Sequence, residues 1–143
     1  MSVFVDTGIF VAAQNKRDAN HKSARAAIDR LLTGELGRAF TSDYVFDETV
    51  TLARVRTGSL AEASLVASRI LGRKPFPHVF DMAMVNAVIF RDALRILESY
   101  KDKPLSFTDA TSIAIVRRRG IGTILSFDAD FDGLVERLDP RSG

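Results

Sequence analysis

The side chains of this sequence that are best suited to chemistry are the carboxylates of Asp6, Glu48, Asp109 and Asp128, which follow or interrupt apolar segments. If these carboxylates converge, they cannot all ionise without a cation, because like charges raise one another's pKa. The sequence has no Cys and only two His, so a bound metal would rest on carboxylate oxygens, which favour Mg²⁺ or Mn²⁺. Such an ion can orient a phosphodiester, stabilise its transition state and activate a water molecule.

Glu48 stands out because of its neighbours in a predicted helix. The residues three and four positions away are mostly apolar, namely Tyr44, Val45, Thr51 and Leu52. An unpaired carboxylate is costly on such a face, so a metal ion, a buried Arg or backbone donors must satisfy it. Asp47 is adjacent in the sequence, but the helical neighbours favour Glu48 as the acid that points inward.

Each of the other acids has an ordinary structural alternative. Ser106-Phe107-Thr108-Asp109 matches a capping box, in which the acid bonds back to the start of its helix, and for Asp109 alone this interpretation is favoured. Asp6 and Asp128 could equally serve turns or helix caps. Asp130 is expected to be more exposed than Asp128 and could cap the helical turn that follows. The sequence leaves open which of these two faces a site.

A mainly parallel sheet would bring the acids together. Apolar runs bounded by turn residues predict strands at residues 3–5, 38–41, 77–80, 123–126 and 135–138. Apolar spacing, caps and terminal glycines predict helical segments at residues 9–13, 18–32, 42–56, 59–71, 83–100, 106–119 and 131–134. This alternation predicts one α/β domain over residues 1–143, with helices flanking a mainly parallel sheet. Ligands of such sheets bind beyond the carboxyl ends of the strands, where Asp6 and Asp128 lie.

Composition limits the remaining possibilities. The 20 Lys and Arg residues nearly balance the 18 Asp and Glu residues, giving a net charge of +2, so any nucleic-acid-binding surface would have to be local. The absence of Cys excludes disulfides, thiolate metal sites and cysteine nucleophiles. No apolar run approaches the roughly 20 residues of a membrane span, and the first residues lack the basic segment of a signal peptide. We therefore expect a soluble, cytoplasmic protein without a membrane partner.

No competing catalytic motif is present in the sequence. It contains no G-x-S-x-G, no G-x-x-x-x-G-K-[ST] and no H-E-x-x-H, and His21 and His78 are isolated. A receiver-like signalling domain would need paired acids after its first strand and a Lys near the end of a late strand, and this sequence has only Asp6 at the first position and further acids at the second. A phosphatase of the haloacid-dehalogenase type would need Asp two residues after Asp6, where Gly8 stands.

Four segments, in this order, resemble the motifs of PIN-domain nucleases. They are Val5-Asp6-Thr7-Gly8, Ser42-Asp43-Tyr44-Val45-Phe46-Asp47-Glu48-Thr49, Leu105-Ser106-Phe107-Thr108-Asp109-Ala110 and Ser126-Phe127-Asp128-Ala129-Asp130-Phe131. Short single-domain members of that family are mostly toxins of the VapC type. The resemblance implies Mg²⁺- or Mn²⁺-dependent cleavage of RNA, a homodimer and a cognate VapB-like antitoxin. A housekeeping PIN nuclease that processes RNA without an antitoxin is the main alternative.

The resemblance also implies roles for individual residues. Asp6 and Asp109 would be the primary metal ligands, with Asp128 as a further ligand and Glu48 completing the acidic pocket. Thr7 and Ser126 match small hydroxyl positions of the family, which would position water or phosphate. The number of metal ions, the RNA target and the identity of the antitoxin do not follow from the sequence.

Basic residues cluster locally and could contact RNA phosphates. Arg54 and Arg56 lie one to two helical turns after Glu48, within reach of phosphates near the acids, although solvated surface charge is the equally ordinary alternative. The run from Arg117 to Arg119 is favoured as a helix end, because cations there complement the helix dipole. Two further clusters consist of Lys16, Arg17, Lys22 and Arg25, and of Arg69, Arg73 and Lys74.

The helices predicted at residues 42–71 carry more apolar residues than one thin layer over a small sheet requires. These residues include Val55, Leu60, Leu65, Val66 and Ile70. In the resembling family this region helps to form the groove for the antitoxin. Packing between the two helices is the alternative, and it is favoured for most of these residues.

Overall fold

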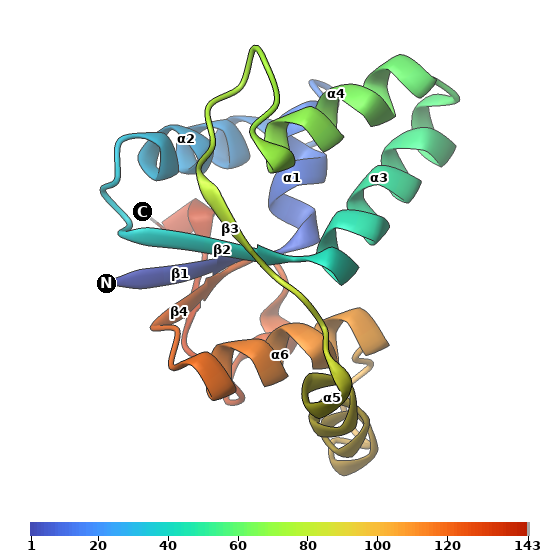
Figure 1. Cartoon of the computed structure of the whole chain (residues 1–143), viewed down its shortest axis with the longest axis vertical. Coiled ribbons are helices and arrows are strands. Elements are labelled where there is room, and N and C mark those ends of the chain that lie inside the picture. Colours follow the sequence, from blue (N-terminus) through green and yellow to red (C-terminus); the bar gives the residue numbers. More distant parts are fainter. Residues whose placement is uncertain (143) are drawn as a thin grey trace.

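Five strands form a parallel sheet in the order β3-β2-β1-β4-β5 in the computed structural model, which describes residues 1–142 (Figure 1). Every neighbouring pair is parallel. The strands are β1 (Ser2–Val5), β2 (Arg38–Ser42), β3 (Phe80–Ala83), β4 (Thr123–Leu125) and β5 (Arg137–Leu138). The predicted α/β class with a parallel sheet is therefore confirmed.

Strand β1 lies at the centre of the sheet, and its residues are apolar on both faces. Val3, Phe4 and Val5 are almost completely buried, as expected for a strand of a parallel sheet that is covered on both sides. Val3 pairs with Ala39 of β2 on one side and with Thr123 of β4 on the other. The carboxyl ends of β1 and β4 therefore lie next to each other.

Helices cover both faces of the sheet (Figure 1). On one side lie α1 (Thr7–Gln14), α2 (His21–Leu32), α3 (Asp43–Thr57) and α4 (Leu60–Leu71), and on the other lie α5 (Ala87–Ser99) and α6 (Phe107–Arg119). The chain moves from β1 outward to β2 and β3, and then returns to the other side of β1 to form β4. This reversal makes the junction of β1 and β4 a topological switch point, where α/β proteins open a crevice for ligands.

The helix ends follow the predicted capping chemistry. Ser42 caps α3 by accepting a hydrogen bond from the backbone N–H of Val45 at 3.0 Å, and Gly58 ends that helix in the left-handed conformation at φ 65°. Ser59 caps α4 in the same way. The α3–α4 pair therefore begins and ends where the sequence indicated.

Several predicted boundaries are wrong, each for a local reason. Helix α2 begins at His21 rather than residue 18, because Asp18 instead forms a turn in which its Oδ1 accepts from the Asn20 N–H. Strand β3 spans Phe80–Ala83 rather than 77–80, because Pro77 has no N–H to donate to a ladder. Helix α5 begins at Ala87 rather than 83, where the Asn86 side chain caps it.

The apolar residues of the α3–α4 pair are divided between core and surface. Val66 and Ile70 are buried, whereas Val55 and Leu60 are 74% and 67% exposed and Leu65 is also exposed. The expectation that most of these residues pack in the core is therefore wrong for three of the five. Among residues 1–142, no helix combines the length and the hydropathy that crossing a membrane would require.

Candidate active site

Asp6 lies at the end of β1 and is 7% exposed. Its backbone N–H donates to the carbonyl oxygen of Leu125 on β4 at 3.1 Å, which continues the pairing of the two strands. Asp6 occupies the N-cap position of α1, but its carboxylate makes no capping hydrogen bond. Its Oδ2 instead accepts from Ser126 Oγ at 2.7 Å. The helix-cap alternative thus does not account for this carboxylate.

Ser126 connects two of the acidic motifs. It is completely buried, and its Oγ donates to Asp6 Oδ2 while accepting from the backbone N–H of Asp128 at 3.0 Å. A hydroxyl has one proton, and this arrangement uses it on Asp6. The Ser126 side chain is therefore placed to hold carboxylates at the junction of β1 and β4.

Asp109 combines both of its proposed roles. Its Oδ2 accepts from the Ser106 N–H and its own N–H donates to Ser106 Oγ, both at 3.0 Å, which completes the capping box at the start of α6. The same side chain lines the cleft that contains Asp6. The capping bond holds the carboxylate by one oxygen and orients it, so capping and a role in the cleft are compatible.

The structure distinguishes between the members of the two adjacent acidic pairs. Glu48 is half-buried and lines the cleft with Asp6, whereas Asp47 is exposed and outside the lining. Asp128 also lines the cleft. Asp128, not Asp130, caps the short helical turn η1 (Ala129–Phe131), because its Oδ1 accepts from the Asp130 N–H at 2.9 Å. The capping alternative is therefore confirmed for Asp128, whereas Asp130, the other candidate, is not the cap, and the predicted helical turn at residues 131–134 is wrong.

One cleft of about 310 Å³ brings these acids together beyond the carboxyl ends of β1 and β4. Its walls come from α1, the α1–α2 turn, α3, the start of α6 and the segment after β4. The lining residues are Asp6, Thr7, Gly8, Val11, Ala12, Asp18, Asn20, Glu48, Leu52, Arg56, Asp109, Phe127 and Asp128. All four predicted acids are present. Of the predicted positioning residues, Thr7 and Arg56 reach the cleft, whereas Arg54 is exposed outside its lining.

The cleft stabilises protons on two of its carboxylates, Asp6 and Asp109. Burial raises the pKa of Asp6 to about 7, against the opposing effect of the Ser126 hydrogen bond, and the charges of Asp109 and Glu48 raise it further. Burial also raises the pKa of Asp109, as do the charges of Asp128 and Glu48. Within residues 1–142, no Lys or Arg forms an ion pair with any of the four acids. A cation bound among these carboxylates would oppose the mutual repulsion of their charges.

The donor set fits a hard, partly hydrated cation. The cleft supplies carboxylate oxygens and the buried Thr7 Oγ1, which has no hydrogen-bond partner among the described residues. In the described part of the chain, no three acidic or imidazole side chains are close enough to enclose an ion as they stand. Mg²⁺ does not need such an enclosure, because it commonly keeps several waters and takes one or two carboxylates.

Comparison with known proteins agrees with this geometry. The model of the PIN domain matches residues 3–136. The chain belongs to the PIN-domain family. It is 34% identical over 136 residues to the 23S rRNA-specific endonuclease VapC20 of Mycobacterium tuberculosis, covering 94% of this chain and 96% of that protein. It is 26% identical over 132 residues to a VapC ribonuclease of Archaeoglobus fulgidus, covering 92% and 80%.

Solved structures agree at the level of the fold. The crystal structure of Mycobacterium tuberculosis VapC20, described as a sarcin–ricin loop cleaving toxin, matches with a TM-score of 0.77 and 33% identity over 94% of this chain and 97% of that one. A toxin–antitoxin complex from Klebsiella pneumoniae matches with a TM-score of 0.67 over 96% and 97% of the two chains, and its 16% identity shows the shared fold alone. The resemblance to PIN-domain proteins of the VapC type is confirmed.

Two polar residues of this PIN-domain cleft were not predicted from the sequence. Asp18 and Asn20 lie in the turn between α1 and α2 and line the cleft with the four acids. Both stand at the start of the helix predicted at residues 18–32, but Asp18 instead forms a turn by accepting from the Asn20 N–H at 2.8 Å. Only the folded arrangement of α1 and α2 brings this turn to the acids.

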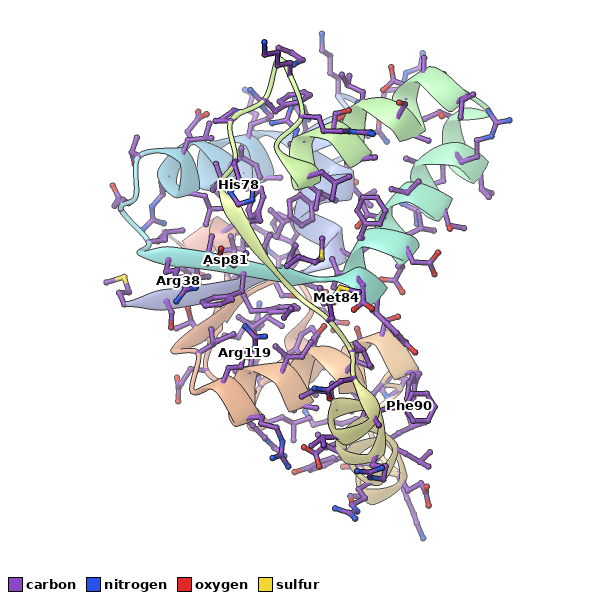
Figure 2. All side chains as sticks on the ribbon, in the orientation of Figure 1. Arg38, His78, Asp81, Met84, Phe90 and Arg119 are labelled. Carbon is purple, nitrogen blue, oxygen red and sulfur yellow. The ribbon has the colours of Figure 1, made fainter. Side chains whose placement is uncertain are left out.

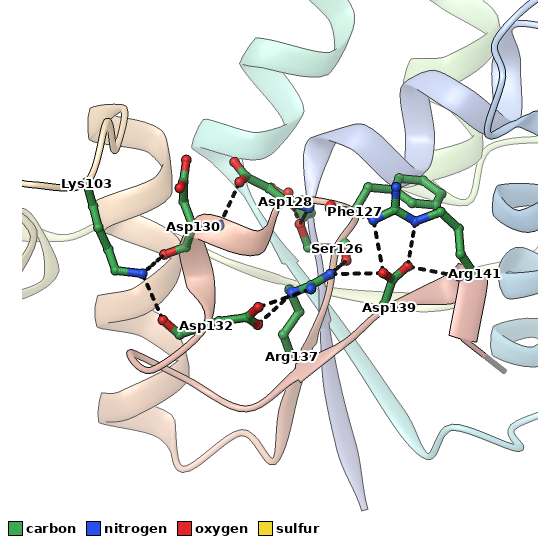
Figure 3. A network of polar contacts seen from close by, with 10 residues as sticks. Lys103, Ser126, Phe127, Asp128, Asp130, Asp132, Arg137, Asp139 and Arg141 are labelled. Atoms are coloured by element: carbon green, nitrogen blue, oxygen red, sulfur yellow. Dashed lines mark hydrogen bonds and ion pairs between the residues drawn. The ribbon is translucent and has the colours of Figure 1, made fainter.

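A network of charged residues behind the last PIN motif also went unpredicted (Figure 3). Arg137 donates to the carbonyl oxygen of Ser126 at 3.0 Å and forms ion pairs with Asp132 and Asp139. Arg141 donates to the carbonyl oxygen of Phe127 at 3.0 Å and pairs with Asp139. The Arg141 hydrogen bond is the main reason that the pKa of Asp139 falls to about 2.

This network fixes the backbone that carries Asp128. Two guanidinium groups hold two consecutive carbonyls, at Ser126 and Phe127, and Lys103 Nζ donates to the carbonyl oxygens of Asp130 and Asp132 at 3.1 and 2.9 Å (Figure 3). The charged residues Arg137, Asp139 and Arg141 stand close together in the sequence, but strand β5 ends at Leu138 and Arg141 lies in the short helical turn η2 (Pro140–Ser142), so no strand periodicity identifies the network.

Proposed function

We propose that this protein is a metal-dependent endoribonuclease of the VapC type, and the toxin of a toxin–antitoxin pair. One observation carries the proposal: four carboxylates from separate parts of the chain line a single cleft at the switch point of the sheet, with no Lys or Arg of residues 1–142 paired to them. Family membership and the VapC relatives support the same conclusion.

Asp6, Asp109 and Asp128 would hold the metal, which we propose to be Mg²⁺ or Mn²⁺. When bound, the ion would supply a charge for the phosphodiester and an activated water nucleophile. Ser126 keeps Asp6 in place through its 2.7 Å hydrogen bond, and the capping box does the same for Asp109. These contacts limit the movement of the carboxylates, and positioning of this kind contributes strongly to catalysis.

The remaining groups of the cleft would act on the substrate. The Glu48 carboxylate is half-buried beside Asp6 and Asp109 and would accept a proton from the attacking water. Thr7 Oγ1 has a proton that no described residue accepts and would donate it to a phosphate oxygen or a water. Arg56, at the rim of the cleft, would contact a phosphate. Arg54 lies on the same helix as Arg56 but outside the lining of the cleft, so it would act on the RNA only through the electrostatic effect of its charge.

The relatives indicate which partners to test. VapC20 is described as specific for 23S rRNA, so ribosomal RNA is the first substrate that we propose for this protein. The exposed apolar residues of α3 and α4 support a VapB-like antitoxin segment on this pair, with an Arg reaching the acids. A homodimer would cover the exposed apolar residues at the start of α5 and before it, including Met84 and Phe90 (Figure 2).

Cleavage of purified ribosomal RNA with and without Mg²⁺ tests the nuclease. Wild type should cut at mapped positions only with the metal, and Asp109→Asn should not cut. Expression in cells tests the toxin role: wild type should arrest growth, Asp6→Ala should not, and the product of an adjacent small gene should relieve the arrest. Equal arrest by wild type and Asp6→Ala would contradict a toxin role, and RNA cleavage without toxicity would support a housekeeping nuclease instead.

A further inference from the structure

A second hollow, separate from the acidic cleft, carries the opposite charge. It has a volume of about 390 Å³ and is lined by residues of α1, α2 and α4 and of the turn after α1. These helices cover one side of the sheet (Figure 1). Its lining residues are Ala13, Gln14, Lys16, His21, Arg25, Glu62, Leu65 and Arg69. Three of them are cations and one is an acid. We call this hollow the basic cavity.

The cations of the basic cavity are not neutralised by the protein. Within residues 1–142, Lys16, Arg25 and Arg69 form no ion pair with a carboxylate. Glu62 is the one carboxylate in the lining, and its Oε2 accepts from Gln14 Nε2 at 2.7 Å, so three cations face a single negative charge. The cavity therefore presents uncompensated positive charge, which is an arrangement suited to an anion.

Arg69 is held in place for such a ligand. Its guanidinium lies 4.8 Å from the centre of the Phe76 ring, and its Nε is buried with no hydrogen-bond partner among the described residues. Burial and then the nearby charge of Arg25 lower the pKa of Arg69, and Asp29 partly opposes this effect. A buried donor without an acceptor and two neighbouring guanidinium groups are both unfavourable for the protein alone. An anion between them would relieve both.

The basic cavity is connected to the acidic cleft. A groove of about 290 Å³ lies between the two, sharing Val11, Leu52 and Arg56 with the cleft and Gln14, Lys16 and Glu62 with the basic cavity. Helix α1 runs the same course, from Thr7 in the cleft to Gln14 in the basic cavity. Seven helical steps correspond to about 10 Å, so an extended strand of a few nucleotides could reach both.

We propose that the basic cavity binds a backbone phosphate of the RNA strand whose scissile bond lies in the acidic cleft. This inference rests on the proposed nuclease function. The acidic cleft repels a polyanion until a metal is bound, so a phosphate site outside the cleft retains and orients the strand. The partly exposed apolar side chains of the connecting groove, Val11 and Leu52, lie where a base between the two phosphates would pack. Contacts of this type supply affinity without reading sequence.

The double variant Lys16→Gln/Arg25→Gln tests the cavity while leaving Arg69 packed on Phe76. Its control is Arg91→Gln/Lys101→Gln, which removes the same charge from exposed positions on α5 and just after it, on the opposite side of the sheet (Figure 1). Binding of a short labelled single-stranded RNA is followed by fluorescence anisotropy in a chelator at several salt concentrations. Matching melting temperatures show that both variants fold.

The cavity variant should bind RNA about tenfold more weakly than the control. Its slope of log K against log salt should be shallower by about 0.7 for each phosphate that the variant no longer neutralises. Equal affinity and slope in the two variants would overturn the inference. It would also be overturned if the variant bound RNA normally but bound an acidic peptide more weakly, which would assign the cavity to a protein partner.

Cleavage of the same RNA in Mg²⁺ separates this inference from the nuclease proposal. The cavity variant should have a raised KM with kcat close to that of the control, because the acids are untouched. Cleavage by wild type with an unchanged KM in the variant would refute the cavity and leave the nuclease standing. RNA binding that depends on the cavity, without any cleavage by wild type, would support the cavity and refute the nuclease.

Discussion

Ser126 Oγ donates a 2.7 Å hydrogen bond to Asp6 Oδ2, which joins two residues that lie 120 positions apart. The same oxygen accepts from the Asp128 N–H, so one buried hydroxyl sets the relative positions of the acids after β1 and β4. The hydrogen bond also favours the ionised form of Asp6 and limits the rise of its pKa. The contact therefore acts on both the geometry and the charge of the cleft.

The variant Ser126→Ala should lose stability and metal affinity. It removes the side-chain hydrogen bond of the buried Asp6 carboxylate and the acceptor of the Asp128 N–H, at a cost of about 1–3 kcal/mol in the free energy of unfolding. The pKa of Asp6 should rise further, so the pH at which cleavage is half-maximal should increase. Ser64→Ala, at an exposed position of α4, is the control and should change neither the urea midpoint nor the pH profile. An unchanged profile in Ser126→Ala would contradict a role for this bond in the charge of the cleft.

The metal-free protein should become less stable as the pH rises from about 4 to about 7. Asp6 has a pKa of about 7 in the fold against 3.8 for the ordinary group, so in this window the folded state binds more protons than the unfolded state. The stabilisation that Asp6 contributes is thus fully present below pH 3.8, the pKa of the ordinary group, and it is lost as the pH rises through about 7, the pKa in the fold. At ~1.36 kcal/mol per pKa unit, the upper limit of the loss is about 4 kcal/mol.

Asp6→Asn is the comparison that isolates this effect. Its free energy of unfolding, measured in urea with a chelator, should change much less than that of wild type between pH 4 and pH 7. Asp139, whose pKa is lowered to about 2, has the opposite sign and acts only below pH 4. Mg²⁺ should reverse the trend for wild type, because the metal competes with the protons. If the free energies of unfolding of wild type and Asp6→Asn changed with pH in the same way, Asp6 would not be the group that binds the proton.

Asp109→Asn should abolish cleavage and retain the fold. The amide oxygen can still accept from the Ser106 N–H, so the capping box survives, while the charge that Asp128 and Glu48 oppose is removed. The melting temperature of the metal-free protein should therefore stay equal or rise. Asp109→Ala separates the two roles, since loss of the acceptor for the Ser106 N–H should lower stability by about 1 kcal/mol while the Ser106 cap itself remains. Full activity of Asp109→Asn would rule out the proposed role of this carboxylate.

The convergence of the four acids could be predicted because it follows from local rules. Asp6 and Asp128 come directly after strands, parallel strands end at one edge, and Glu48 lies on an apolar helix face. The choice between Glu48 and Asp47 followed from the same helical spacing. Capping of α3, α4 and α6 followed from Ser and Gly at the expected positions.

The features that escaped prediction depend on tertiary placement. Arg137 and Arg141 hold carbonyl oxygens, and nothing in the sequence identifies which carbonyl a distant guanidinium will meet. Exposure of Val55 and Leu60 depends on what surrounds α3 and α4, and apolar residue types alone indicated a core. Strand β3 was misplaced because the predicted run began at Pro77, within an irregular segment, and not at the first residue that pairs with β2.

Arg137→Gln should reduce cleavage without touching a carboxylate of the cleft. Arg137 holds the Ser126 carbonyl and pairs with Asp132 and Asp139, so the variant releases the segment that carries Asp128 (Figure 3). We expect a loss of about 1–3 kcal/mol in stability and at least a tenfold loss of kcat/KM. Arg118→Gln breaks a surface pair with Asp92 on α5 and should leave stability nearly unchanged and activity unchanged, because surface ion pairs contribute little. Equal activity in the two variants would show that the network is only structural.

Glu48→Gln and Asp47→Asn form a matched pair that tests which adjacent acid acts in the cleft. The two substitutions remove one charge each from neighbouring positions of α3, but only Glu48 lines the cleft and Asp47 is exposed. Glu48→Gln should lower kcat at saturating Mg²⁺ by about 10²-fold or more, as removal of a general base does. Asp47→Asn should leave kcat within about twofold, as surface substitutions do. If Asp47→Asn were the inactive variant, α3 would have to be rotated relative to its position in this structure, and the proposed proton acceptor would be wrong.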